Sequence, residues 1–420
     1  MKQVAKMKNS VFPLVLFILL SSIDAISQKM PYKWENRNLT DSEINALIKK
    51  NSPINGAKIP VDLKYRLGAT HVGGKYSLTQ EPFLIEGCKA IENLGFGTIK
   101  LWFRNNPAAG YPYNSDWDLP QNATLTDIAR HPYFKAVFNM PFKVFALSLG
   151  GKADLKKAFG DLSHDFSADR DEIYELAKYL LTAYKDREIT FIFQNWEGDW
   201  LLRGGTGTST HWKTDSYPQD VKKRCEVMID WFKARQDGVN RARNEIINSK
   251  CKIYHAIEVN KVTDCQNGIP GLTSDVLPFV STDLVSWSCY DGLKNPIALW
   301  RGIDYIKKNI KPTGVFPGVP VMIGEIGIPE QREPLATEEE IVNRWDSSMA
   351  VFFGQKIPYI FHWEVYCNEP KDDSKAKFFP MRTKDEMKGF WLIRPDGSES
   401  YCARFLEKLL KNAGERLTDY

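Results

Sequence analysis

The chain of 420 residues has few cysteines, few histidines and little net charge. Seven cysteines are too few for a fold held together by disulfides, and six histidines without a His-x-His or His-Glu-x-x-His pattern give no metal site. A net charge of +4 is small for a nucleic-acid-binding protein, which usually needs a basic stripe. We therefore predict no metal and no nucleic-acid partner.

Several patterns that mark common enzyme classes are also absent. No Gly-x-Gly-x-x-Gly follows an early strand, no Gly-x-Ser-x-Gly elbow is present, and no internal repeat recurs. The glycine-rich sequence 204–210 lacks the Lys-Ser/Thr that closes a phosphate-binding loop. These absences disfavour a dinucleotide-binding fold, a serine esterase and a solenoid, and we expect no cofactor.

Residues 1–25 have the pattern of a secretory signal peptide. Three lysines precede an apolar run from Val11 to Leu20, and small or polar residues follow it. The run is shorter than the roughly 20 residues that span a bilayer, so we predict no membrane span. Cleavage would remove three lysines and one aspartate, leaving a net charge of +2. The expected location is secreted or periplasmic.

The rest of the chain is expected to form one domain. Residues 26–60 are polar and predict an N-terminal lead-in, followed by a single catalytic domain over residues 61–420. Export permits disulfides, but the sequence leaves open whether Cys251 and Cys265 pair.

Short apolar runs alternate with helical patterns along this domain. Runs such as 189–193 are apolar at every position but one, which suits a parallel sheet covered on both faces. Eight such runs predict a (β/α)8 TIM barrel, with an open doubly wound sheet as the alternative. The runs are 66–72, 98–103, 143–149, 189–194, 252–259, 283–289, 319–324 and 358–363, and the helical patterns are 171–184, 219–232, 296–310, 338–353 and 401–410.

Glutamates follow two of the predicted strands, at the end of a barrel where chemistry is found. Glu197 follows the fourth strand, and Glu325 follows the seventh beside Gly324. Two carboxyl groups that face each other can cleave a glycosidic bond, one as a proton donor and one in its ionised form. Glu258 and Glu364 also lie near strand ends and remain rival carboxylates.

Several strand-end motifs resemble those of the clan A retaining glycoside hydrolases, and most closely their family 5 of cellulases and mannanases. Ile323-Gly324-Glu325-Ile326-Gly327 is similar to the nucleophile strand, and residues 360–364 are similar to the tryptophan-bearing eighth strand. Ser288-Cys289-Tyr290 and residues 389–397 resemble the sixth strand and the closing turn of that group. The resemblance spans residues 60–412.

The resemblance implies a role for each of these residues. Glu325 would be the nucleophile, with Tyr290 donating a hydrogen bond to it, and Glu197 would be the acid/base. Trp363 would form the floor of the sugar site. Some substrate-binding residues are predicted from the resemblance and others from their position at strand ends. Together they are Asn195, Tyr290, Trp363, Trp102, Lys100, His71 and His255. Trp287 and Trp231 are expected to pack between barrel and helices.

The sequence also departs from the family pattern. Trp196 separates Asn195 from Glu197, Lys100 stands where family 5 has arginine, and Ser288 stands where histidine is common. Either a bulge restores the geometry around Glu197, or Asn195 no longer binds a sugar hydroxyl.

Three functions remain open at this point. The favoured one is a secreted retaining glycoside hydrolase that cleaves a β-glycan or β-glycoside, with an oligo- or polysaccharide as its partner. The alternatives are a catalytically silent carbohydrate-binding TIM barrel and an oxidoreductase or lyase barrel. The last would need a phosphate site after strands seven and eight, and residues 328–330 do not offer one.

Overall fold

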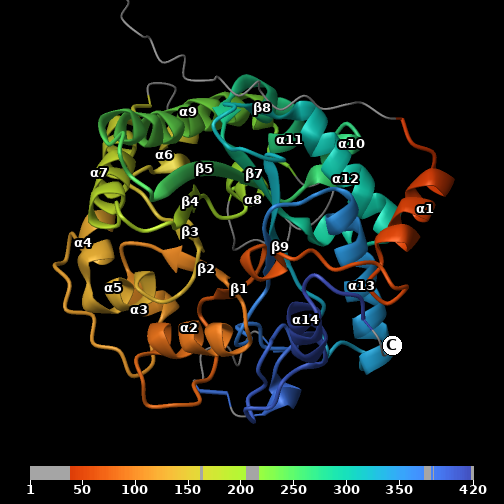
Figure 1. The fold of residues 1–420 in the computed structure, drawn as a ribbon. Coiled ribbons are helices and arrows are strands. Elements are labelled where there is room, and N and C mark those ends of the chain that lie inside the picture. Colours follow the sequence, from red (N-terminus) through yellow and green to blue (C-terminus); the bar gives the residue numbers. More distant parts are fainter. Residues whose placement is uncertain (1–37, 161–163, 205–216, 373–379, 382, 418–420) are drawn as a thin grey trace, which may run out of the picture.

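A closed ring of eight parallel strands lies inside a layer of helices (Figure 1). The structure is a computed structural model that describes residues 38–160, 164–204, 217–372, 380–381 and 383–417. Neighbouring strands of the ring are in chain order, and the last strand pairs with the first, so the predicted (β/α)8 TIM barrel is confirmed. The strands are β1 (Leu67–His71), β2 (Thr98–Phe103), β3 (Val144–Leu149), β4 (Thr190–Gln194), β5 (Lys252–Val259), β7 (Leu284–Ser288), β9 (Val321–Ile326) and β10 (Ile360–His362).

Helices follow the strands and cover the outside of the barrel (Figure 1). Between β5 and β7 the chain forms short elements, among them the helices α10 (Val262–Gln266) and α11 (Leu272–Asp275). A separate two-stranded sheet joins β6 (Ser281–Thr282) to β8 (Lys311–Pro312). The other helices are α2 (Phe83–Asn93), α3 (Pro107–Gly110), α4 (Leu125–Arg130), α5 (Pro132–Phe138), α6 (Leu155–Gly160), α7 (Ser167–Ala183), α8 (Gly198–Leu202), α9 (Val221–Glu245), α12 (Pro296–Asn309), α13 (Glu338–Gly354) and α14 (Tyr401–Lys411).

Local sequence signals fix several helix starts. Asn295 caps α12 by accepting a hydrogen bond from the Ala298 amide at 2.8 Å, and Pro296 occupies the first turn, where its missing N–H costs nothing. Ser400 caps α14 in the same way. Several predicted boundaries differ from the structure: α7 begins at Ser167, α9 runs on to Glu245, and β9 runs through Glu325 to Ile326.

The described part of the predicted lead-in lies against the barrel. Helix α1 (Asp41–Asn51) packs on α13, and the Ser52 hydroxyl donates a 2.6 Å hydrogen bond to Asp346 of that helix. The predicted signal segment 1–25 and residues 205–210 of the glycine-rich sequence lie outside the described residues. Over the described ranges, none of the helices is both long and apolar enough to cross a membrane.

All seven cysteines lie in the described part of the chain, where they are buried and unpaired. Cys251 and Cys265 therefore do not form the disulfide that the sequence left open. Burial raises the pKa of both thiols to about 12, so each acts as a small apolar side chain.

The contact between α12 and the barrel has no room for one more carbon atom. A Cβ on Gly302 would lie 2.2 Å from the buried indole of Trp287, whose Nε1 donates to Asp291 at 3.0 Å and so cannot turn away easily. We expect Gly302→Ala to lower the free energy of unfolding by about 1–3 kcal/mol, because α12 must shift outward. Chemical denaturation measures this loss.

Gly160→Ala is the matched control for this prediction. Gly160 ends α6, and a Cβ there would meet no atom of the described residues within 4 Å. Alanine also has the higher helix propensity, so this variant should be at least as stable as the parent. Equal stability of the two variants would contradict the close contact at Trp287.

Candidate active site

Glu197 and Glu325 converge on one hydroxyl group at the C-terminal ends of the strands. The Ser288 Oγ atom lies 2.7 Å from Glu197 Oε1 and 3.3 Å from Glu325 Oε2. Both glutamates are buried, with exposed fractions of 3% and 2%. The chain therefore brings together the two carboxyl groups that the sequence singled out, although they are far apart along it.

A shift in strand register puts Ser288 at this position. Trp287 of β7 pairs with Ile323 of β9, whereas Ser288 pairs with Glu325, so β9 has one extra residue between the two pairs. Such a bulge changes the direction in which the following side chains point. Ser288, whose identity departs from the family pattern, thereby contacts both glutamates.

The backbone at Glu197 accommodates the extra residue Trp196. Glu197 has φ 29° and ψ 73°, a left-handed conformation that costs a residue with a side chain about 1–3 kcal/mol. Its amide donates to Glu258 Oε1 at 2.9 Å, which holds the turn in place. Of the two alternatives left by the sequence, the structure has the irregular turn that returns the Glu197 carboxyl group to the barrel axis.

Asn195 links β4 to β5. Its side-chain amide donates to the Glu258 carbonyl at 3.1 Å and accepts from the Glu258 amide at 2.8 Å. The side chain is 1% exposed and borders a cavity beside Glu197. A contact between Asn195 and a sugar hydroxyl stays a prediction.

Lys100 was expected among the substrate-binding residues, and the structure corrects this expectation. Its ammonium group donates to Glu325 Oε1 at 2.8 Å, to Glu258 Oε2 at 3.0 Å and to the Gly324 carbonyl at 3.1 Å. These three acceptors occupy its three N–H groups, and the side chain is fully buried. Lys100 is the cationic partner of two buried carboxylates.

Glu258 lies behind the pair and connects its supports. One carboxylate oxygen accepts from the Glu197 amide, and the other accepts from Lys100, from Ser286 at 3.1 Å and from Gln194. A side chain at Gly324 would lie 2.7 Å from Glu258 Oε2 and 1.9 Å from Ser286 Oγ. The glycine therefore gives room to this carboxylate network.

The surroundings push the pKa values of the two facing glutamates apart. Burial raises the pKa of Glu197 well above its usual value, and the charges of Glu325 and Glu258 raise it further. Burial also raises the pKa of Glu325, to about 7, but Lys100 and Ser288 stabilise its ionised form. Glu197 thus tends to be the proton donor and Glu325 the carboxylate.

Tyr290 was expected to donate a hydrogen bond to Glu325, and this bond is not formed. Among the described residues the Tyr290 hydroxyl has no partner, although its oxygen is buried. Burial raises the pKa of this phenol well above its usual value, and the nearby charges of Glu325, Glu369 and Glu197 raise it further. A neutral donor without a partner is therefore left next to the carboxyl pair.

His71 and His255 were expected to line the pocket, and both lie elsewhere. His71 contacts the Phe83 carbonyl of α2 at 2.8 Å and packs against aromatic rings. His255 lies 3.2 Å from Gln236 of α9. Burial lowers the pKa of His71 to about 4 and also holds the pKa of His255 well below its usual value. They fill the layer between barrel and helices.

Two of the tryptophans predicted to bind substrate lie at or just after strand ends. Trp363 follows β10, is 7% exposed and donates from Nε1 to Glu369 at 3.3 Å. Trp102 of β2 is half-buried, with its ring centroid 6.0 Å from that of Trp196. Their roles as sugar platforms stay predictions. Trp287 and Trp231 are buried in the hydrophobic core, as expected.

The rival Glu364 accepts a hydrogen bond from the Asn368 amide at 2.7 Å. Burial raises its pKa well above the usual value, and the charges of Glu369 and Glu325 raise it further. Within the described ranges, no three His, Cys, Asp or Glu side chains are grouped to hold a metal ion.

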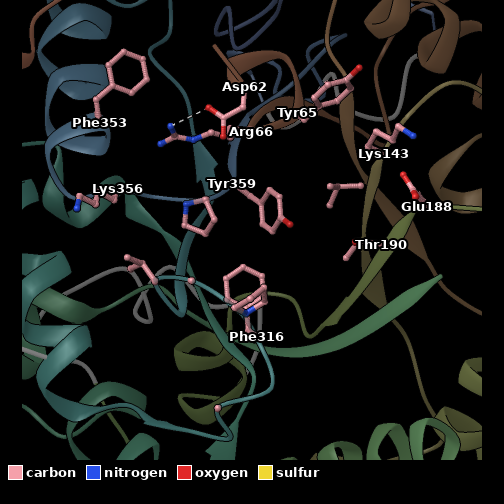
Figure 2. Close-up of a pocket in the computed structure, with 16 residues that line it drawn as sticks. Asp62, Tyr65, Arg66, Lys143, Glu188, Thr190, Phe316, Phe353, Lys356 and Tyr359 are labelled. Carbon is pink, nitrogen blue, oxygen red and sulfur yellow. Dashed lines mark ion pairs between the residues drawn. The ribbon is translucent and has the colours of Figure 1, made fainter. Parts of the chain in front are cut away.

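A cavity of about 1150 Å³ opens at the opposite end of the barrel (Figure 2). It is lined by residues that precede or begin strands, such as Arg66, Lys143 and Tyr359, and Figure 2 shows the ion pair of Arg66 with Asp62. Because chemistry in TIM barrels is found at the C-terminal ends of the strands, this cavity is not part of the candidate active site.

Sequence reasoning gave no role to Ser288, and it treated Glu258 only as a rival. A usable signal was present for Glu258, because a charged residue in an otherwise apolar strand needs a buried partner, and Lys100 is the same kind of residue in β2. The sequence contains no comparable signal for the register shift that brings Ser288 to the two glutamates.

No protein-family model and no curated protein matches the sequence. A GH5_18 structure from Streptomyces cattleya in complex with GlcNAc is similar in fold, with a TM-score of 0.50, 11% identity and coverage of 85% of this chain and 80% of that one. A GH5_18 structure from Bifidobacterium longum subsp. infantis has a TM-score of 0.49, 11% identity and coverage of 84% and 79%. A GH5-4 broad specificity endoglucanase from Ruminococcus champanellensis has a TM-score of 0.46, 12% identity and coverage of 90% and 99%.

The likeness to the Streptomyces cattleya structure shows a shared barrel fold. The distant resemblance to family 5, which the strand motifs predicted, is therefore matched at the level of the fold. The architecture is one that glycoside hydrolases use.

Proposed function

We propose that the protein hydrolyses a glycosidic bond with retention of anomeric configuration, with Glu325 as nucleophile and Glu197 as acid/base. The observation that carries the proposal is the shared contact of both carboxyl groups with Ser288. Since their nearer oxygens lie 2.7 and 3.3 Å from one hydroxyl, they are at most about 6 Å apart. Retaining pairs are about 5–5.5 Å apart and inverting pairs about 6.5–9.5 Å.

In the first step, a Glu325 oxygen attacks the anomeric carbon while Glu197 gives its proton to the departing glycosidic oxygen. Oε1 is held by Lys100, whereas Oε2 has only the long contact with Ser288 and is the freer nucleophile. In the second step, Glu197 takes a proton from water, whose oxygen displaces Glu325 from the sugar. The unpartnered Tyr290 hydroxyl is a donor for the substrate or for the ring oxygen of this intermediate.

The catalytically silent carbohydrate-binding barrel is less well supported. A silent barrel would be favoured if the two carboxyl groups were far apart, or if the Trp196 side chain filled the space between them. Here the carboxyl groups share one hydroxyl, and Trp196 borders a cavity to one side of Glu197. Export by an N-terminal signal peptide is part of the proposal, because a polysaccharide substrate lies outside the cell.

Product stereochemistry tests the proposal. The protein is incubated with neutral and acidic polysaccharides and with aryl β-glycosides, and the anomeric protons of the first products are followed by NMR. We expect the β-anomer to appear first and to mutarotate later. An α-anomer as first product would contradict Glu325 as nucleophile. Absence of hydrolysis across the panel, with glycan binding retained, would favour the silent barrel.

A further inference from the structure

A small cavity of about 380 Å³ lies beside Glu197, at the C-terminal ends of β2, β3 and β4. Among the described residues, three cationic side chains line it, Arg104, Lys156 and Arg235, and one carboxylate, Asp169. The described lining of the cavity therefore carries a net positive charge. It borders Asn195 and Trp196, the two residues immediately before the proposed acid/base.

Arg104 is a guanidinium without an acidic partner. Its Cζ lies 3.9 Å from the Trp102 ring centroid and 5.9 Å from that of Trp196, so it is stacked on the two indoles of the cleft. Among the described residues no carboxylate pairs with it, and burial lowers its pKa. Stacking fixes the plane of the guanidinium and leaves its edge of N–H donors available for an anion.

Arg235 is more buried and only partly satisfied. It is 1% exposed, and its one ion-pair contact is from Nη1 to Asp169 at 3.4 Å. Its Nε and Nη2 atoms are buried and have no partner among the described residues. Asp169 also accepts from Trp231 Nε1 and from the Lys152 amide, each at 2.9 Å, so its charge is shared. The charge of Glu172 also acts on Arg235, but it leaves the buried Nε and Nη2 donors without an acceptor, and such donors favour a further anion at the cavity.

The glycines after β3 let the chain pass close to these side chains. A Cβ on Gly151 would lie 2.0 Å from Asp169 Oδ1 and 3.4 Å from Arg235 Nη1, and a Cβ on Gly150 would lie 3.3 Å from the Arg104 Cα. The two glycines thus let the backbone lie directly against both arginines.

We propose that this cavity binds an anionic substituent, a carboxylate or a sulfate, on the glycan whose bond the glutamates cleave. This inference rests on the proposed function in one respect, namely that the bound glycan is also cleaved. The preference of the cavity for an anion can be measured separately. Arg104 would bind the anion with two parallel N–H groups while its indole neighbours contact the sugar ring. A neutral glycan would leave the cationic cavity without a counter-charge.

Binding by a catalytically inactive variant tests the inference apart from hydrolysis. The Glu325→Gln protein is applied to a glycan array that carries neutral oligosaccharides beside the same backbones bearing uronic acid or sulfate. We expect the acidic glycans to bind more tightly than their neutral counterparts, and salt to weaken this binding. Arg104→Gln, added to Glu325→Gln, is expected to lower the affinity for the best acidic glycan by at least about tenfold, with a smaller loss for Arg104→Lys.

The matched control is Arg130→Gln, also made in the Glu325→Gln background. Arg130 is exposed and stacks on Tyr179 with its Cζ 4.9 Å from the ring centroid, so it resembles Arg104 in its contact but lies on α4, away from the cavity. This variant should bind acidic glycans as the parent does. Thermal unfolding of each variant shows whether the fold is kept.

Three outcomes overturn the inference: neutral glycans bound as tightly as acidic ones, no acidic glycan bound, or acidic binding that Arg104→Gln leaves unchanged. A preference for uronates over sulfates, or the reverse, identifies the anion. If acidic glycans bind but the parent protein cleaves none, the cavity assignment stands and the proposed hydrolysis fails. If neutral glycans are hydrolysed with retention and acidic ones are not bound, only the cavity assignment fails.

Discussion

Glu325→Gln is expected to lower kcat/KM by about 10⁴-fold or more and to leave the fold intact, because the variant keeps the side-chain volume and removes the attacking oxygen. Lys100 retains Glu258 as its ionic partner, so the loss of stability should be small beside the loss of activity. Steady-state kinetics on the best substrate measures the first effect, and thermal unfolding measures the second.

Two further variants make this result specific. Glu364→Gln replaces another buried glutamate at a strand end. Because burial raises the pKa of this carboxyl group and so favours its neutral form, a neutral glutamine should change activity little. Glu197→Gln should slow substrates with poor leaving groups much more than aryl glycosides with good ones, since the latter need little proton donation. Activity of Glu325→Gln close to that of the parent would remove Glu325 from the mechanism.

The barrel could be predicted from the sequence because its strands are buried on both faces. Strands such as β3 and β4 are mostly apolar. The segments between the strands have apolar residues at helical spacing, which marks where one strand ends and the next begins. The resulting strand list matched the ring to within a few residues. The strand motifs also placed Glu197 and Glu325 at the correct end of the barrel, because parallel strands all end on the same face.

The errors arose where the outcome depends on which face of a strand a side chain occupies. His71 pairs in register with Leu101, and His255 pairs with Phe193, and these four side chains all face the helices. Lys100, one position before Leu101, faces the barrel axis instead. A shift of one residue in a strand moves each side chain to the opposite face of the sheet. The register between neighbouring strands cannot be predicted from the sequence of one strand alone.

The network behind the glutamates was missed for a related reason. Lys100, Glu258 and Ser286 come from three different strands and meet only when the ring closes. Ser288 reaches both glutamates only because β7 and β9 shift in register. The sequence showed charged residues within apolar strands, which predicts buried pairing, but it did not show which of them are partners.

Lys100→Met is expected to have the second largest effect, because it removes the cation between two buried carboxylates. With Glu258 and Glu325 left without a counter-charge, the free energy of unfolding at neutral pH should fall by about 3–5 kcal/mol. Chemical denaturation at several pH values measures this loss. The loss should shrink at low pH, since protonated carboxyl groups need no cation.

The activity of Lys100→Met should also change in a defined direction with pH. Lys100 lowers the pKa of Glu325, so its removal raises that pKa above about 7. The nucleophile must be ionised, and activity on the acid side of the profile should therefore require a higher pH than in the parent. The pH dependence of kcat/KM measures this displacement, which loss of packing alone would not produce.

Removal of both partners separates charge from packing. In Lys100→Met with Glu258→Gln, one carboxylate is gone together with the cation, and the remaining network has fewer uncompensated charges. We expect this double variant to be more stable than Lys100→Met alone, so that the two changes are strongly non-additive. If the losses simply add, or if Lys100→Met keeps the stability and pH profile of the parent, then Lys100 does not hold the charge state of the nucleophile, and the ionised form of Glu325 depends on Ser288 and the substrate.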